Sequence, residues 1–133
     1  KRLNLSIPYE PLPFMLPAPS QGVVVVAGKT SNEEINDVLR QISHTETQHC
    51  VSIEREFLRT LEGGCTAPIG AFAEVIGDQI RFQGRLCSVD GQNCIESEET
   101  ISAGAVEGAG KKLADTILQN GGSAIMQEIN SQR

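Results

Sequence analysis

The sequence predicts an α+β fold in which helices pack on one face of a three-stranded antiparallel sheet. Three observations predict it. A central segment alternates between apolar and polar residues and is flanked by glycine turns. Segments with helical spacing of apolar residues come before and after it. A chain of 133 residues, 39% of them hydrophobic, is long enough to bury one core. The order of two helices, three strands and two helices places all the strands in one sheet.

The first 28 residues read as a connector rather than as part of the domain. The stretch "IPYEPLPFMLPAPSQG" holds all but one of the six prolines, and proline favours extended backbone. Residues 23–28, "VVVVAG", are apolar on both faces, which is typical of a strand inside a sheet. Nothing nearby in the sequence pairs with this segment. We therefore expect a connector with an orphan strand over 1–28 and a domain over 29–133.

Two helices are expected next. Ser31 and Glu34 have the spacing of a capping box, and they predict a helix over 32–43. Its apolar stripe is made of Ile35, Val38, Leu39 and Ile42.

The second helix is predicted to start at Thr45 with Gln48 as the capping partner. Its apolar stripe includes Cys50, which predicts a small core residue there. Gly63 and Gly64 end the helix, because glycine accepts the left-handed backbone of a helix C-terminus. Cys65 follows in a loop before Pro68, where glycine and proline favour exposure and a fixed geometry.

The strands are predicted near 69–76, 79–86 and 93–99, joined by turns at Gly77-Asp78 and Asp90-Gly91. In the central strand, Ile80, Phe82, Gly84 and Leu86 face one way and Gln79, Arg81, Gln83 and Arg85 face the other. A helix over 104–120 and a short helix over 123–130 complete the domain, with Gly121-Gly122 between them.

The last two cysteines have two alternative placements. A two-residue turn at Asp90-Gly91 puts Cys87 directly across from Cys94, on the polar face. It also keeps Ile95 on the same face as Leu86. A three-residue loop with a bulge at Gly91 would separate the two cysteines. We expect reduced thiols in either case.

Composition and spacing argue against several classes of site. The net charge is −6, and the lysines and arginines are scattered, so nucleic acid is not an expected partner. No apolar run approaches the ~20 residues that span a bilayer, so no membrane association is expected. The four cysteines form no C-x-x-C pair, which argues against metal and redox motifs and favours reduced cytoplasmic thiols.

Other candidate motifs have simpler explanations. "GAVEGAGKK", residues 104–112, lacks the first glycine of a phosphate loop at Ala105 and has Lys112 in place of Ser or Thr. His44 and His49 are five residues apart, which does not place them on one helix face, so they are predicted to be surface or capping residues. Glu96, Glu98 and Glu99 are predicted on a solvated edge strand, not at a metal.

One segment resembles a known family. Residues 54–75, "EREFLRTLEGGCTAPIGAFAEV", resemble the cysteine-loop segment of the porphobilinogen deaminase (hydroxymethylbilane synthase) family. "FMLPAPSQG", "HTETQHCVSIERE" and "LCSVDG" resemble that family's crossing segment, the helix before the cysteine and a sheet hairpin. The resemblance runs from Phe14 to Glu128. It departs from the family at Ser20, where the family usually has glycine.

The resemblance implies an enzyme that joins porphobilinogen units head to tail into a linear tetrapyrrole, with release of ammonia. In that family the matched cysteine, here Cys65, holds a dipyrromethane cofactor through a thioether. The family's basic cleft lies in two preceding domains. The resemblance therefore implies a C-terminal domain of a cytoplasmic transferase, with no catalytic residue in this segment and no activity of its own.

The alternative to the enzyme is a free-standing binding module that kept the fold without the chemistry. In the family, the segment that resembles "VVVVAG" joins the sheet of a neighbouring domain. Without that partner we expect it either to be disordered or to pair with a second copy through residues 23–27.

Overall fold

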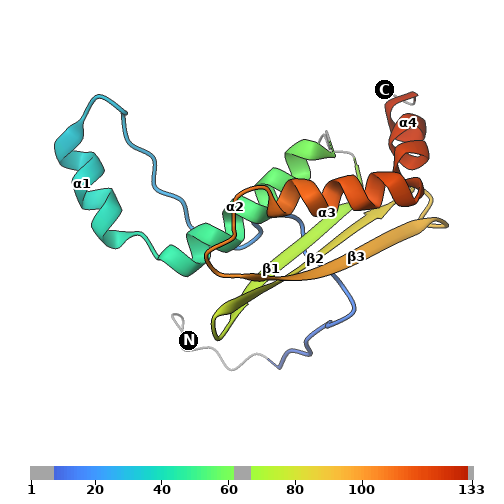
Figure 1. The fold of residues 1–133 in the computed structure, drawn as a ribbon, viewed down its shortest axis with the longest axis horizontal. Helices are drawn as coiled ribbons and strands as arrows, with labels where there is room; N and C mark the ends of the chain where they lie inside the picture. The colour runs from blue at the N-terminus through green and yellow to red at the C-terminus, as the bar shows by residue number, and fades with distance from the viewer. Residues whose placement is uncertain (1–7, 62–66, 132–133) are drawn as a thin grey trace.

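The structure is a computed structural model that describes residues 8–61 and 67–131. Its elements are α1 (Glu33–Ile42), α2 (Thr45–Thr60), β1 (Ile69–Ile76), β2 (Gln79–Cys87), β3 (Cys94–Ser102), α3 (Ala109–Ile117), a π-helical turn η1 (Leu118–Gly122) and α4 (Ser123–Ser131). The strands form one antiparallel sheet in the order β1-β2-β3. Helices α2 and α3 lie over one face of it (Figure 1). The predicted fold class is confirmed.

The two faces of the sheet follow the alternation of the sequence. In β2, Ile80, Phe82 and Leu86 are buried beneath the helices, while Arg81 and Arg85 are on the opposite face. The first hairpin has the predicted two-residue turn, because Ile76 pairs with Gln79 and Gly77 has a φ of +64°. The buried core joins the sheet to the helices through Ile53, Phe57, Leu61, Ala71, Ile80, Phe82, Leu86, Leu113, Ala114, Ile117 and Ile125.

Two glycines let the elements of this core approach closely. A Cβ atom at Gly84 of β2 would lie 2.6 Å from the ring of Phe57. That ring packs edge-on against Phe82, with centroids 5.5 Å apart. A Cβ atom at Gly110 of α3 would lie 2.2 Å from the carbonyl oxygen of Ile53. Helix α2 therefore lies in direct backbone contact with α3.

The starts of the first two helices differ from the predicted capping boxes. The Ser31–Glu34 box is wrong, because Asn32 is the N-cap of α1 and its Oδ1 accepts from Ile35 N at 3.1 Å. Helix α2 begins at Thr45 as predicted, but its cap is His44, whose Nδ1 accepts from Thr47 N at 3.3 Å. Both side chains place an acceptor where the first free N–H groups of the helix point. Of the two alternatives predicted for His44, a surface or a capping residue, the structure shows a capping residue.

The helix predicted over 104–120 is wrong at its start. Residues 104–108 form turns, and α3 begins at Ala109 after Gly108, which has a φ of +78°. Its first N–H groups bond to Glu56 of α2, since Oε2 accepts from Gly110 N at 3.0 Å and from Lys111 N at 3.3 Å. The acceptor comes from another helix and is therefore invisible in the local sequence.

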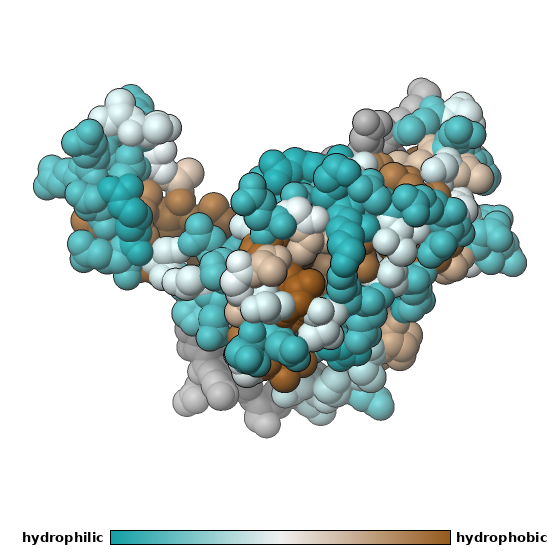
Figure 2. All heavy atoms as spheres, in the orientation of Figure 1, coloured by the Kyte–Doolittle hydropathy of each residue, from teal (hydrophilic) through white to brown (hydrophobic). Residues whose placement is uncertain are grey.

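Residues 23–28 and α1 form an arm that projects from the body (Figure 1). The structure has no strand at 23–28, and Val24 is 90% exposed. The arm folds on itself, because Val23–Val26 and the α1 residues Leu39 and Ile42 line one groove. Apolar atoms lie on its inner side (Figure 2). The apolar segment is therefore extended and exposed here, not buried in a sheet of this chain.

We predict that Gly110→Ala lowers the free energy of unfolding by about 3 kcal/mol, because the added methyl group would force α2 and α3 apart. Gly104→Ala is the matched control, since its Cβ would meet nothing within 4 Å, and it should cause no loss of stability. Urea unfolding followed by circular dichroism measures both. Equal stability of the two variants would contradict the observed packing.

Candidate functional site

The segment that carries Cys65, residues 62–66, lies outside the described residues, and the structure shows its two anchors. Leu61, the C-cap of α2, is buried in the core. On the other side, Pro68 O accepts from Cys87 N of β2 at 3.0 Å, and β1 begins at the next residue. The two residues that flank the segment, Leu61 and Pro68, are thus fixed to the packed body of the domain.

The hairpin of β2 and β3, which contacts Pro68, contains Cys87 and Cys94. Cys87 pairs directly with Cys94, and Leu86 pairs with Ile95, so the predicted register is confirmed. The structure joins Cys87 to Cys94 in a disulfide, and the expectation of reduced thiols is wrong. The physical reason is their position: the Cα atoms of this pair are 4.1 Å apart, which brings the two sulfur atoms within bonding reach.

The turn of this hairpin differs from the prediction although the register does not. Ser88 N donates to Asn93 O at 2.8 Å, and Gly91 N donates to Ser88 O at 2.9 Å, so the turn is centred on Val89 and Asp90. The predicted two-residue turn at 90–91 and the observed four-residue loop at 89–92 leave the same cross-strand pairs, because both are centred between Asp90 and Gly91. Asp90 accepts from Ser88 Oγ and Gln92 N, and these bonds hold its pKa below the ordinary value.

A second segment runs along the free edge of β1, and we call residues 16–22 the crossing segment. Leu16 lies over Gly70, where a Cβ would be 2.9 Å away, and Pro17 O accepts from Ala71 N at 2.9 Å. The segment then turns, with Gln21 N donating to Ala18 O at 3.0 Å. Ser20 stands at the third position of this turn with a φ of +63°. Glycine is the residue that adopts such a position most readily.

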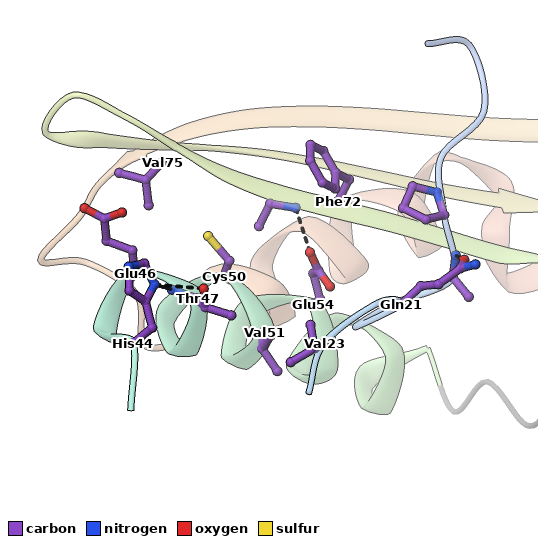
Figure 3. A pocket seen from close by; sticks show the side chains of 13 residues that line it. Gln21, Val23, His44, Glu46, Thr47, Cys50, Val51, Glu54, Phe72 and Val75 are labelled. Carbon is purple, nitrogen blue, oxygen red and sulfur yellow. Dashed lines mark hydrogen bonds between the residues drawn. The ribbon is translucent and has the colours of Figure 1, made fainter. Parts of the chain in front are cut away.

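A buried carboxylate links this turn to the body. Glu54 of α2 is only 6% exposed. Its Oε2 accepts from Ser20 N at 2.6 Å and its Oε1 accepts from Ala73 N at 2.8 Å. Burial raises the pKa of Glu54, and the two N–H groups oppose that effect without cancelling it. Figure 3 shows the carboxylate pointing from α2 to the backbone of β1.

A groove of about 280 Å³ opens beside Glu54, between the crossing segment, α2 and β1 (Figure 3). Cys50 lines it, and the prediction of a buried core cysteine is confirmed. Burial, and next the charge of Glu54, raise the pKa of the Cys50 thiol. A thiol held protonated in this way is a poor nucleophile. Cys50 is therefore a packing residue.

The polar face of the sheet carries arginines that are already paired. Arg81 donates to both oxygens of Glu98 at 2.9 Å, which raises the pKa of Arg81 and lowers that of Glu98. Arg85 Nε lies 2.7 Å from Glu96 Oε1. Glu96 and Glu98 thus lie on an edge strand as predicted. Glu99 faces the helices instead and pairs with Lys112.

Within the described ranges, no cluster of His, Cys, Asp and Glu could hold a metal ion, and no helix is long and apolar enough to cross a bilayer. Glu54 was not among the residues singled out from the sequence. A signal for it exists, because Glu54 lies in the apolar stripe of Cys50, Ile53, Phe57 and Leu61. A carboxylate in such a stripe needs buried partners.

The chain is similar to known proteins. Residues 48–119 match the family model described as the C-terminal domain of porphobilinogen deaminase. The chain belongs to the porphobilinogen deaminase family. The match covers the whole of the sheet and α3, together with most of α2, and it includes Cys65.

Full-length relatives named porphobilinogen deaminase show the same similarity. The chain is 38% identical to the protein from Geobacter sp. strain M21 over 119 residues, which is 90% of this chain and 37% of that protein. It is 40% identical to the Listeria welshimeri protein over 118 residues and 34% identical to the Syntrophomonas wolfei protein over 131 residues. The chain spans 37% and 43% of the lengths of these two relatives.

We predict that thiol titration of freshly denatured, unreduced protein detects no more than two of the four cysteines, because Cys87 and Cys94 are joined. Two further groups should appear after reduction. The Cys87→Ser, Cys94→Ser double variant is the control, and its count should not change on reduction. Four groups in the fresh wild-type protein would restore the expectation of reduced thiols.

We predict that Ser20→Gly raises the free energy of unfolding by about 1 kcal/mol, because glycine adopts a positive φ without a Cβ clash. The substitution also removes the Ser20 hydroxyl, which is buried without a hydrogen-bond partner. Ser52→Gly on the exposed face of α2 is the control and should lower stability, since glycine is unfavourable inside a helix. Thermal and urea unfolding measure both variants.

Proposed function

We propose that this chain is the C-terminal part of a cytoplasmic porphobilinogen deaminase, a transferase of tetrapyrrole biosynthesis, and that Cys65 carries its dipyrromethane primer. The observation that carries the proposal is the cysteine in "LEGGCTAPIG" within the segment that matches the family's C-terminal domain. The primer would supply the terminal pyrrole to which porphobilinogen units are joined, each addition releasing ammonia.

The described flanks fit an attachment point of this kind. The thiol lies four residues after buried Leu61 and three before Pro68, whose carbonyl oxygen bonds to β2. The described residues on either side of the thiol, Leu61 and Pro68, are both held by the body of the domain. The chain thus contributes a covalent anchor and rigid support for it.

The remaining machinery is proposed to lie in two preceding domains. A substrate and product rich in acetate and propionate groups need arginine and lysine side chains to bind them. Here Arg81 and Arg85 are paired with glutamates, and the whole chain carries a charge of −6. We therefore assign the catalytic and carboxylate-binding residues to those domains, and expect the 133-residue chain alone to be inactive.

Residues 1–28 are proposed to connect this domain to the others. The amide groups of Val24–Ala27 have no hydrogen-bond partner among the described residues. Their apolar side chains are exposed as well. An extended segment in this condition is suited to pairing with the edge of another sheet.

We predict that the complete enzyme carries the mass of a dipyrromethane and that peptide mapping places it on Cys65. Cys65→Ser should lack both the added mass and the activity, because a hydroxyl is a much weaker nucleophile than a thiolate. Cys50→Ala is the matched control and should keep both. An adduct on Cys50, Cys87 or Cys94 would contradict the assignment.

The 133-residue chain expressed alone separates the enzyme from a free-standing module. We expect its mass to equal that of the bare polypeptide, because the cleft that loads the primer is proposed to lie elsewhere. A two-pyrrole mass on this chain would show that the cleft is dispensable for loading. Activity restored on adding the two preceding domains would exclude the free-standing module.

We predict that the isolated chain either self-associates through 23–27 or exchanges the amide protons of these residues rapidly. Val25→Lys should abolish any self-association, because a charge on this segment opposes strand pairing. Analytical ultracentrifugation and amide exchange measure the two alternatives. A strict monomer with protected amides at 23–27 would contradict both.

A further inference from the structure

The crossing segment is attached to the body by very few polar contacts. Pro17 O meets Ala71 N, and the carboxylate of Glu54 meets Ser20 N. Beyond this turn the chain continues into the arm, whose first residue on the groove wall is Val23. Following the chain from residue 16 toward the arm, Ser20 is the last residue that bonds to a side chain of α2.

Glu54 also completes the edge of the sheet. Along the free edge of β1, Ala71 N is satisfied by the crossing segment, but two residues later the segment has turned away. At that point Glu54 Oε1 accepts from Ala73 N. One carboxylate therefore takes the place of the missing strand and holds the turn that displaced it.

The two partners of Glu54 are both donors, which makes the site selective for a carboxylate. An ionised carboxylate has two acceptor oxygens and no donor. A glutamine side chain of the same shape offers one oxygen and one NH₂ group, and the NH₂ group would face an N–H. An aspartate is one methylene shorter, so its carboxylate would not reach the two amides from the same position on α2.

We propose that Glu54 is the positioning residue of the crossing segment: its carboxylate locks the Pro19-Ser20 turn to the edge of β1 and so sets the direction in which the arm leaves the domain. The lock acts on the crossing segment and not on the core, whose packing depends on other side chains. This inference concerns the 133-residue chain itself and does not rest on the proposed function.

The wild-type chain provides the first test. In an NMR pH titration, the amide protons of Ser20 and Ala73 should shift together, with one midpoint above the ordinary range of glutamate, as burial of Glu54 requires. Other titratable groups near the groove are His44, Glu46 and Cys50 on α2 and Glu74 on β1. Separate midpoints, or no shift at either amide, would overturn the proposal.

Variants provide the second test. Glu54→Gln should increase amide exchange at Ser20 or Ala73 by about tenfold or more, because one of the two hydrogen bonds to a charged acceptor is lost. Exchange at Phe82 and Leu86 in the core should stay unchanged. Glu54→Asp should loosen both sites.

Glu56→Gln is the matched control, because Glu56 also accepts from two backbone N–H groups, at Gly110 and Lys111. It should affect exchange in α3 and leave Ser20 and Ala73 protected. Full protection of both amides in Glu54→Gln would overturn the proposal. A uniform loss of protection across the core would overturn it too, since Glu54 would then support the whole fold instead of one segment.

Discussion

The close approach of α2 to the sheet and to α3 is the constraint on which the rest of the structure depends. Phe57 lies directly on the backbone of β2 because Gly84 has no side chain, and α3 reaches the backbone of α2 at Gly110 for the same reason. Interiors packed at this density do not absorb an added methyl group without movement of whole elements. The position of α2 therefore determines where every segment attached to it lies.

Three such segments are attached to α2, two of them through carboxylates. Glu54 holds the crossing segment, Glu56 holds the first turn of α3, and Leu61 leads into the segment that carries Cys65. Both glutamates bind backbone N–H groups, which are numerous and fixed in place, so neither link depends on the long side chain of a basic residue. A shift of α2 would therefore move the crossing segment, α3 and the Cys65 anchor together.

Features set by local pattern were predictable from the sequence, and features set by contacts between distant segments were not. The alternation in β2 and the even-numbered turn placed Cys87 across from Cys94. The two predicted capping boxes were wrong because several polar residues stand near each helix start, and the sequence does not say which of them caps the helix. The late start of α3 depends on Glu56, more than fifty residues earlier in the chain.

In the candidate site too, the residue in a local motif was predictable and the residue with distant partners was not. Its cysteine was found through a sequence motif, whereas Glu54 was missed because its partners, Ser20 and Ala73, are 34 and 19 residues away. Residues 24–28 are exposed, which agrees with the expectation that this apolar run has no partner within the chain.

The electrostatics of the chain separate its proposed role from that of the rest of the enzyme. The arginines of the sheet are paired with glutamates, so this face adds little positive potential to a net charge of −6. A growing product that gains carboxylates with each unit would be repelled by such a surface and attracted to a basic cleft. In the proposed enzyme, the covalent bond at Cys65 would hold the product to a domain that offers it no unpaired arginine on the polar face of its sheet. The product would then move through the cleft as it lengthens, because no ionic contact with this sheet face would have to break at each addition.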